Sequence, residues 1–182
     1  TLYWDRSAES TQDKYMGNIT NGADLYDFEG YKIYRATDFE FNDAYNITDG
    51  DGNPTFLEPY VQNGVRAQWD LVDGKSGWHP VDLNGIKFYL GDDTGLTHSY
   101  VDHNVVNGQR YYYAVVSYDY GGDLSNNIIP SDSPMKLRVN PLTGAVSLGP
   151  NVVEVVPSPP SAGFVDASFA GDQVDHVLGA SS

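Results

Sequence analysis

The strongest structural signal in this chain is the stretch Tyr100-Val-Asp-His-Asn-Val-Val-Asn-Gly-Gln-Arg-Tyr-Tyr-Tyr-Ala-Val-Val-Ser-Tyr-Asp119. It contains the end of one strand, a turn at Gly108, and a long strand over residues 109–119 that is rich in aromatic and β-branched side chains. Such side chains are enriched in strands, and glycine at a turn lets the chain reverse its direction. The stretch therefore predicts two strands of an all-β protein.

Similar period-two patterns predict strands over residues 1–5, 28–36, 97–102 and 134–140. The chain has 19 glycines and 14 tyrosines, and short β-branched runs lie between Gly, Asn and Asp clusters, which favours strands and turns over helices. No segment has a convincing helical pattern. We therefore expect an all-β fold without helices.

Three of these strands resemble core strands of the fibronectin type III family. Residues 2–4 (Leu-Tyr-Trp) match the Leu-x-Trp pattern of that family's first core strand, and residues 31–35 (Tyr-Lys-Ile-Tyr-Arg) match Tyr-x-Ile/Val-x-Arg. Residues 111–117 match Tyr-x-Tyr-x-Val-x-Ala except at the last position, which is serine. The resemblance implies a non-catalytic β-sandwich of the fibronectin type III/immunoglobulin-like kind. It also implies an inward-facing set of core residues: Trp4, Tyr31, Ile33, Tyr111, Tyr113 and Val115.

Two further roles follow from this resemblance. Tyr111 would be the tyrosine corner, a tyrosine whose hydroxyl bonds to the backbone just upstream. Asp102 would end a strand before the turn, where its side chain would bond backbone N–H groups. Both roles are structural.

The predicted sandwich spans residues 1–140 and contains two insertions, at 6–27 and 38–96. The second insertion has several Asn-Gly and Asp-Gly turn signals and two strand-like pieces, so we expect extra hairpins that widen one sheet. Its aromatic residues are expected to serve in packing: Phe56, Trp69, Trp78 and Phe88. Residues 141–182 are expected to form a strand-bearing C-terminal extension.

The amino-acid composition indicates which partners and which location suit this protein. The formal net charge of −15 and the pI near 4.2 argue against nucleic acid and anionic membranes as partners, since these bind clustered Lys and Arg. Cysteine is absent, so no disulfide stabilises the fold. No stretch approaches the roughly 20 apolar residues of a membrane span, and we predict no membrane insertion. A secreted or cell-surface protein fits these properties.

The string Asp49-Gly-Asp-Gly-Asn53 places oxygen donors at the first, third and fifth positions of a possible calcium loop. An EF-hand needs Gly at position six and Glu at position twelve, where this chain has Pro54 and Tyr60. Two interpretations stay open: a calcium site of another kind at Asp49, Asp51 and Asn53, or a hairpin turn. Calcium is the one cofactor that the sequence suggests.

Two glycosylation sequons occur, at Asn18-Ile-Thr20 and Asn46-Ile-Thr48. Both fall in the predicted insertions, so we expect Asn18 and Asn46 to be exposed in loops. No pattern indicates catalysis, because the four histidines are scattered and form no metal-binding motif. The many aromatic residues allow a second interpretation, a stacking platform for glycans.

The ends of the chain suggest assembly. Thr1 begins directly on the Leu-x-Trp strand, whereas the family has an earlier strand that covers this sheet edge, and an uncovered edge pairs readily with another chain. Strand-like runs at 152–156 and 173–178, on either side of Pro157-Ser-Pro-Pro160, exceed what the sandwich needs. Donation of such a run to the next copy would form a head-to-tail homopolymer. The alternative is that the first strand of the sandwich is simply missing from this sequence. The residues assigned to this contact are Thr1, Leu2, Val152, Val153, Val155, Val156, Val174, Val177 and Leu178.

A closer resemblance is to sandwich domains of large secreted bacterial cell-surface proteins. It is carried by residues 27–37 (Asp-Phe-Glu-Gly-Tyr-Lys-Ile-Tyr-Arg-Ala-Thr), the acidic insertion, and residues 149–157 (Gly-Pro-Asn-Val-Val-Glu-Val-Val-Pro). It implies a structural subunit of an extracellular filament or surface assembly without enzyme activity. The alternatives are a glycan- or calcium-binding adhesion module and an accessory domain of a secreted hydrolase.

Overall fold

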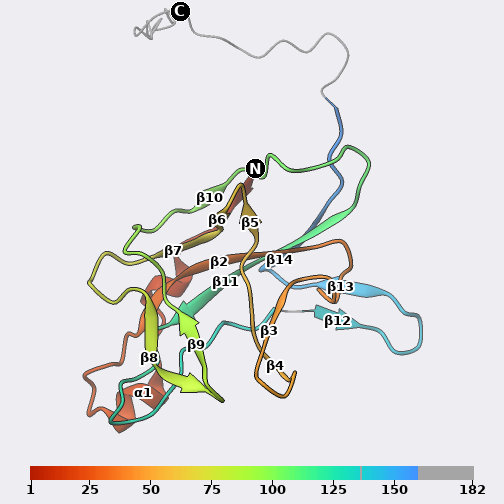
Figure 1. Cartoon of the computed structure of the whole chain (residues 1–182). Coiled ribbons are helices and arrows are strands. Elements are labelled where there is room, and N and C mark those ends of the chain that lie inside the picture. Colours follow the sequence, from red (N-terminus) through yellow and green to blue (C-terminus); the bar gives the residue numbers. More distant parts are fainter. Residues whose placement is uncertain (136, 160–182) are drawn as a thin grey trace, which may run out of the picture.

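The computed structural model describes residues 1–135 and 137–159 (Figure 1). One α-helix, α1 (Lys14–Ile19), and one 3-10 helix, η1 (Ser7–Ser10), accompany the strands in this part of the chain. The strands are β1 (Leu2–Tyr3), β2 (Phe28–Ala36), β3 (Asn46–Thr48), β4 (Pro54–Leu57), β5 (Val61–Gln62), β6 (Val65–Arg66), β7 (Gln68–Asp70), β8 (Trp78–Leu83), β9 (Ile86–Tyr89), β10 (Ser99–Tyr100), β11 (Tyr111–Asp119), β12 (Leu137–Val139), β13 (Val146–Leu148) and β14 (Val152–Val155). The all-β prediction is confirmed at the level of fold class.

The predicted strands are observed with different accuracy. The strand expected at 28–36 is β2 over its whole length, and that expected at 109–119 is β11, which begins at Tyr111. The strands expected at 1–5, 97–102 and 134–140 contain only the short β1, β10 and β12. The long aromatic runs are therefore the reliable part of the pattern.

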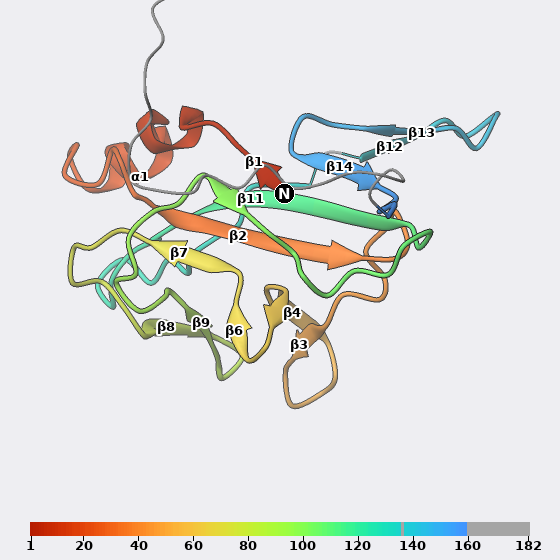
Figure 2. The same ribbon diagram turned by 90° about the horizontal axis from the view of Figure 1, so that it is seen from above.

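The centre of the molecule is a four-stranded antiparallel sheet in the order β14-β11-β2-β7 (Figure 2). Its two long strands, β11 and β2, pair along their length, with Tyr113 opposite Arg35 and Val115 opposite Ile33. Side chains alternate between the two faces of each strand. The register therefore gives this sheet two faces, and both of them are covered.

The first face carries the predicted core and is covered by the β1–β10 pair, in which Leu2 lies opposite Tyr100. Four of the six expected core residues are buried, namely Tyr31, Ile33, Tyr111 and Tyr113. The other two, Trp4 and Val115, are partly buried and pack against the same cluster. The period-two pattern thus identified this face correctly.

The opposite face was not expected to be buried. Here Tyr34, Tyr112 and Val116 belong to a second apolar cluster, and residues of three hairpins, β3–β4, β8–β9 and β12–β13, pack over this face. Only β7 of the second insertion widens the central sheet, because the hairpins pair within themselves. The expectation that the hairpins extend one sheet was wrong, since they form an additional layer.

The aromatic residues of the second insertion contribute unequally to this layer. Phe88 is 2% exposed, whereas Trp78 is 59% exposed and packs edge-on against Tyr89. Phe56 and Trp69 are partly buried. All four make packing contacts, as expected, but Trp78 does so at the surface. Trp78 alternates along β8 with the buried His79, and its side chain points to solvent.

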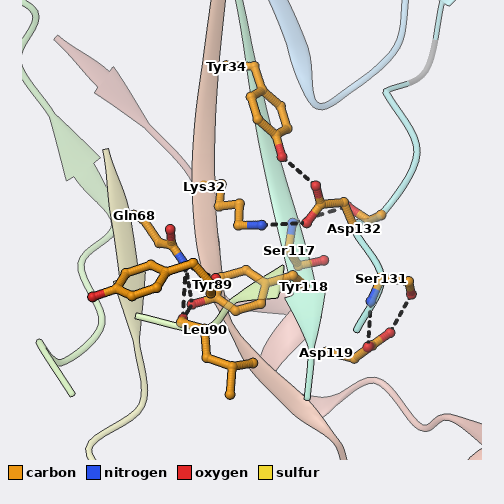
Figure 3. A network of polar contacts seen from close by, with 11 residues as sticks. Lys32, Tyr34, Gln68, Tyr89, Leu90, Ser117, Tyr118, Asp119, Ser131 and Asp132 are labelled. Carbon is orange, nitrogen blue, oxygen red and sulfur yellow. Dashed lines mark hydrogen bonds and ion pairs between the residues drawn. The ribbon is translucent and has the colours of Figure 1, made fainter. Parts of the chain in front are cut away.

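A buried charge lies under the same layer (Figure 3). Lys32 is 3% exposed, its ammonium lies 3.2 Å from a carboxylate oxygen of Asp132, and it stacks 3.5 Å from the centre of the Phe88 ring. The hydroxyl of Tyr34 donates a hydrogen bond to the same carboxylate. An ion pair with an added hydrogen bond satisfies a charge that would otherwise be expensive to bury.

The expectation that the chain has no helix was wrong in the first insertion. Helix α1 begins after Asp13, whose carboxylate accepts hydrogen bonds from the backbone N–H groups of Tyr15 and Met16. Such an N-cap satisfies backbone donors that the first helical turn leaves free. Met16 is 2% exposed and anchors the helix. A single short turn with one buried side chain gives too little periodicity to be recognised in the sequence.

The C-terminal run Val152–Val156 is not surplus, which corrects the first donor assignment. Its residues Val152–Val155 form β14 and pair with β11, with Val153 opposite Tyr113. The boundary expected at residue 140 falls between β12 and β13, two strands of one hairpin. Residues up to Val155 therefore belong to the same packed body as the first part of the chain. No helix within the described ranges is long and apolar enough to cross a membrane.

Candidate functional site: the groove beside β1

A groove of about 740 Å³ lies between β1 and the β11–β14 side of the central sheet. Leu2 and Tyr3 of β1 line one side, and Val152 and Val153 of β14 line the other. Tyr113 and other residues of the first face of the sheet also line it. The groove is thus a place where the apolar interior between two layers reaches the surface.

The backbone of β1 is paired on one side only within residues 1–135 and 137–159. Its partner is β10, with Leu2 opposite Tyr100 and Tyr3 opposite Ser99. A strand with one free edge presents a row of N–H and C=O groups to which a further strand can add. Main-chain pairing at this edge, together with apolar side chains in the adjoining groove, is the chemistry of β-strand addition.

The structure places some of the predicted assembly residues together. Leu2 is partly buried in this groove, and Val153, which is 43% exposed, lines it from the other side. Val152 is 7% exposed and Val155 is partly buried, so both are used in the molecule's own core. Thr1 and Val156 are exposed. Val174, Val177 and Leu178 lie outside the described residues.

Asp102 accepts hydrogen bonds from side chains on β2, on β11 and just before β5. Its carboxylate accepts hydrogen bonds from the Tyr113 hydroxyl at 2.7 Å, from Arg35 at 2.8 Å and from the Tyr60 hydroxyl at 3.3 Å. It also accepts the backbone N–H of Asn104 at 2.8 Å, the structural role expected from the sequence. Burial opposes the charge, but the hydrogen bonds from Tyr113 and Arg35 outweigh it and lower the pKa of Asp102.

The tyrosine corner is confirmed. The hydroxyl of Tyr111 accepts the backbone N–H of Val106 at 3.0 Å, and Tyr111 is 5% exposed. This bond fixes the turn that precedes β11. The predicted partner, backbone just upstream, is the one observed.

The Asp49–Asn53 segment forms the turn between β3 and β4. The Asp49 carboxylate accepts the backbone N–H groups of Asp51 and Asn53, and it also accepts the amides of Asn53 and Asn84. The hydrogen bonds from Asn53 are the main cause of the lowered pKa of Asp49. This geometry is that of a hairpin turn. A calcium ion at Asp49, Asp51 and Asn53 stays a prediction.

Both sequon asparagines are exposed, as expected, but neither lies in a loop. Asn18 is in α1, and Asn46 is the first residue of β3. The structure has a short helix and a short strand at these positions, where the polar composition of the insertions had suggested loops. Glycosylation of Asn18 and Asn46 stays a prediction.

Comparison of the chain with protein-family models, with curated proteins and with solved structures found no match. The resemblance to fibronectin type III domains therefore depends on the sequence patterns alone.

Proposed function

We propose that this protein is a non-catalytic structural subunit of an extracellular assembly, in which a strand from one copy adds to β1 of the next. The groove beside the free edge of β1 is the observation that carries this proposal. It combines unpaired backbone groups with an apolar lining, and strand addition uses both, the first for affinity and the second for specificity.

A fibronectin type III-like sandwich is part of the same proposal. The strands that carry the family's three sequence patterns are β1, β2 and β11, and β2 and β11 are neighbours in the central sheet. The β1–β10 pair lies over one face of this sheet, which supports a two-layer core of the kind that this family has. The hairpins on the other face are an elaboration of that core.

The donor that we propose is the C-terminal segment of a second copy, residues 160–182, with the apolar positions Val174, Val177 and Leu178. Val152–Val155 cannot serve, because these residues already pair with β11. The described chain ends at Pro159, shortly after the carbonyl of Pro157 accepts the N–H of Gly108 at 2.8 Å. An extended chain spans about 3.3 Å per residue, so the remaining segment has ample length to reach another molecule.

Contacts of this kind are head-to-tail, because donor and acceptor are different surfaces. Unless the chain of contacts closes into a ring, it propagates into a filament. The acidic composition, with a formal net charge of −15, and the two exposed sequons support an extracellular location. Copies of the same chain are therefore the proposed partners.

Truncation tests the proposal. Removal of residues 160–182 is expected to abolish filaments or higher oligomers in negative-stain microscopy and size-exclusion chromatography. The melting temperature should stay near that of the full chain, because the four described strands of the central sheet all lie within the retained residues. A synthetic peptide of residues 171–182 is then expected to raise the melting temperature of the truncated protein by mass action. Assembly that survives the truncation, or a full chain that stays monomeric at every concentration, would contradict the proposal.

A matched pair of substitutions tests the acceptor. Val153→Arg places a charge in the groove, and Val139→Arg places the same charge on the β12–β13 hairpin, where Val139 is 45% exposed against 43% for Val153. We expect Val153→Arg to block assembly and Val139→Arg to leave it unchanged. Equal effects of the two substitutions would show that the groove is not the acceptor.

A further inference from the structure

Three carboxylates converge at one end of the central sheet, away from any motif found in the sequence. Asp13 is the N-cap of α1, Asp27 precedes β2, and Asp119 is the last residue of β11. One carboxylate oxygen from each lies within 4.8 Å of the other two. Residues far apart in the chain thus bring three negative charges to one point.

Asp27 is the least exposed member of this cluster. It is 7% exposed, and its Oδ2 atom is buried without a hydrogen-bond partner among the described residues. Burial, followed by repulsion from Asp119 and Asp13, raises the pKa of Asp27 to about 6. A buried carboxylate oxygen without a partner is rare in proteins, since it loses its hydration and gains nothing in exchange.

No protein cation pairs directly with these carboxylates. No ion pair within the described part of the chain includes Asp13, Asp27 or Asp119, although Lys14 lines the adjoining cavity. A bound cation would supply a direct counter-charge to the three carboxylates.

The carboxylates of Asp13 and Asp119 are held in place by hydrogen bonds from the protein. Oδ1 of Asp13 accepts the N–H groups of Tyr15 and Met16 at the start of α1. The Asp119 carboxylate accepts the backbone N–H of Ser131 at 2.8 Å and its hydroxyl at 2.5 Å (Figure 3). Such bonds orient the oxygens before any ligand arrives, as outer-shell contacts do in metal sites.

We propose that Asp13, Asp27 and Asp119 form a calcium-binding site. Calcium prefers oxygen ligands at about 2.3–2.6 Å, so oxygens up to about 4.6–5.2 Å apart can contact one ion. The three oxygens lie within 4.8 Å of one another, which is compatible with contact to one calcium ion. Magnesium demands near-ideal octahedral geometry and is usually bound through one or two carboxylates, so a set of three carboxylates favours calcium. An adjoining cavity of about 510 Å³ leaves room for the water ligands that complete the coordination.

The ion would join the first insertion to the two long strands of the central sheet. Asp13 belongs to the insertion, whereas Asp27 and Asp119 adjoin β2 and β11. Ala8 and Thr11 of the same insertion line both this cavity and the groove beside β1. Calcium would therefore also fix one wall of the groove. The site itself does not depend on whether the groove accepts a strand.

Calcium titration of the full chain, freed of metal with a chelator, tests the site. Calcium chloride at about 100 times the dissociation constant is expected to raise the melting temperature by about 5–10 °C. Asp27→Asn and Asp119→Asn are each expected to remove this shift in melting temperature. Each should also weaken calcium binding, measured by isothermal titration calorimetry, at least tenfold, because even the loss of an outer-shell partner of a metal ligand has an effect of about this size. Asp27→Asn also relieves repulsion, so in chelator it should melt at or above the wild type.

Asp51→Asn is the matched control, since it removes one acidic charge from the other candidate calcium segment. It is expected to keep the full calcium shift. A wild type that does not respond to calcium, or Asp27→Asn and Asp119→Asn variants that respond fully, would overturn the proposal. Loss of the response in Asp51→Asn alone would move calcium to the β3–β4 turn and overturn it as well. An equal shift with magnesium chloride would overturn the assignment to calcium.

Discussion

At the scale of single residues, Asp102 is an acceptor shared by the backbone and by side chains of two strands. Its carboxylate accepts the N–H of Asn104, and Arg35 and Tyr113 meet on the same carboxylate. These two residues lie opposite each other in the β2–β11 register, and register is a property of two strands that neither strand specifies alone.

Asp102 should make stability depend on acid pH. Its pKa is lowered in the folded state, so its contribution is present above the unfolded pKa of about 3.9 and is lost as pH falls through the folded value. Asp102→Asn is expected to destabilise the protein by about 2–3 kcal/mol at neutral pH, the effect of hydrogen bonds to a charged group. Urea unfolding at several pH values measures this. The gap between wild type and variant should narrow below about pH 4, and a gap that stays constant would show that the charge of Asp102 does not matter.

Asp13, Asp27 and Asp119 give the opposite lesson at this scale. Nothing in their spacing marks them, because 14 and 92 residues separate Asp13 from Asp27 and Asp27 from Asp119 (27 − 13 and 119 − 27). The regular spacing of Asp49–Asn53 suggested a calcium site instead, but the Asp49 carboxylate accepts backbone N–H groups within a turn. Only the fold brings the three carboxylates together.

At the scale of elements, both faces of the central sheet are buried. Residues 111–118 are almost continuously apolar or aromatic, as is typical of strands covered on both faces, whereas residues 31–36 include Lys32 and Arg35. The resemblance to a simple sandwich implied only one buried face, and the run in β11 was the signal for the second. What the sequence could not supply was the identity of the cover, since each hairpin pairs within itself and contacts the sheet only through tertiary packing.

The cover formed by β8 and β9 can be tested by two aromatic truncations. Phe88→Ala is expected to destabilise the protein by about 3–5 kcal/mol, because Phe88 is 2% exposed and packs on Tyr118 and Lys32. Trp78→Ala, on the same hairpin but 59% exposed, should cost less than about 1 kcal/mol. Chemical denaturation measures both. Similar losses for the two variants would mean that the hairpin does not cover the sheet as described.

At the scale of the whole molecule, fold class and charge were predictable because they depend on sums over many residues. The packed body extends at least to β14, beyond the expected boundary at 140, because Val152–Val155 pair with β11, a partner about 40 residues earlier in the chain (152 − 114 = 38). A strand-like run near the end of a chain can pair with a strand of its own molecule or with a strand of a second copy. The amino-acid composition of the run does not distinguish these two pairings.

The charge of the whole molecule governs the last prediction. Each copy carries a formal net charge of −15, so a head-to-tail contact between copies is opposed by repulsion. Raising sodium chloride from about 0.01 M to 0.15 M shortens the Debye length from about 30 Å to 8 Å and screens this repulsion. The critical concentration for assembly of the full chain should therefore fall, as measured by sedimentation or light scattering.

A chelator present throughout separates this effect from calcium binding. The chain without residues 160–182 is the control and should stay monomeric at both salt concentrations. A critical concentration that rises with salt would contradict this prediction. It would mean that attraction between opposite charges, and not strand addition, holds the copies together.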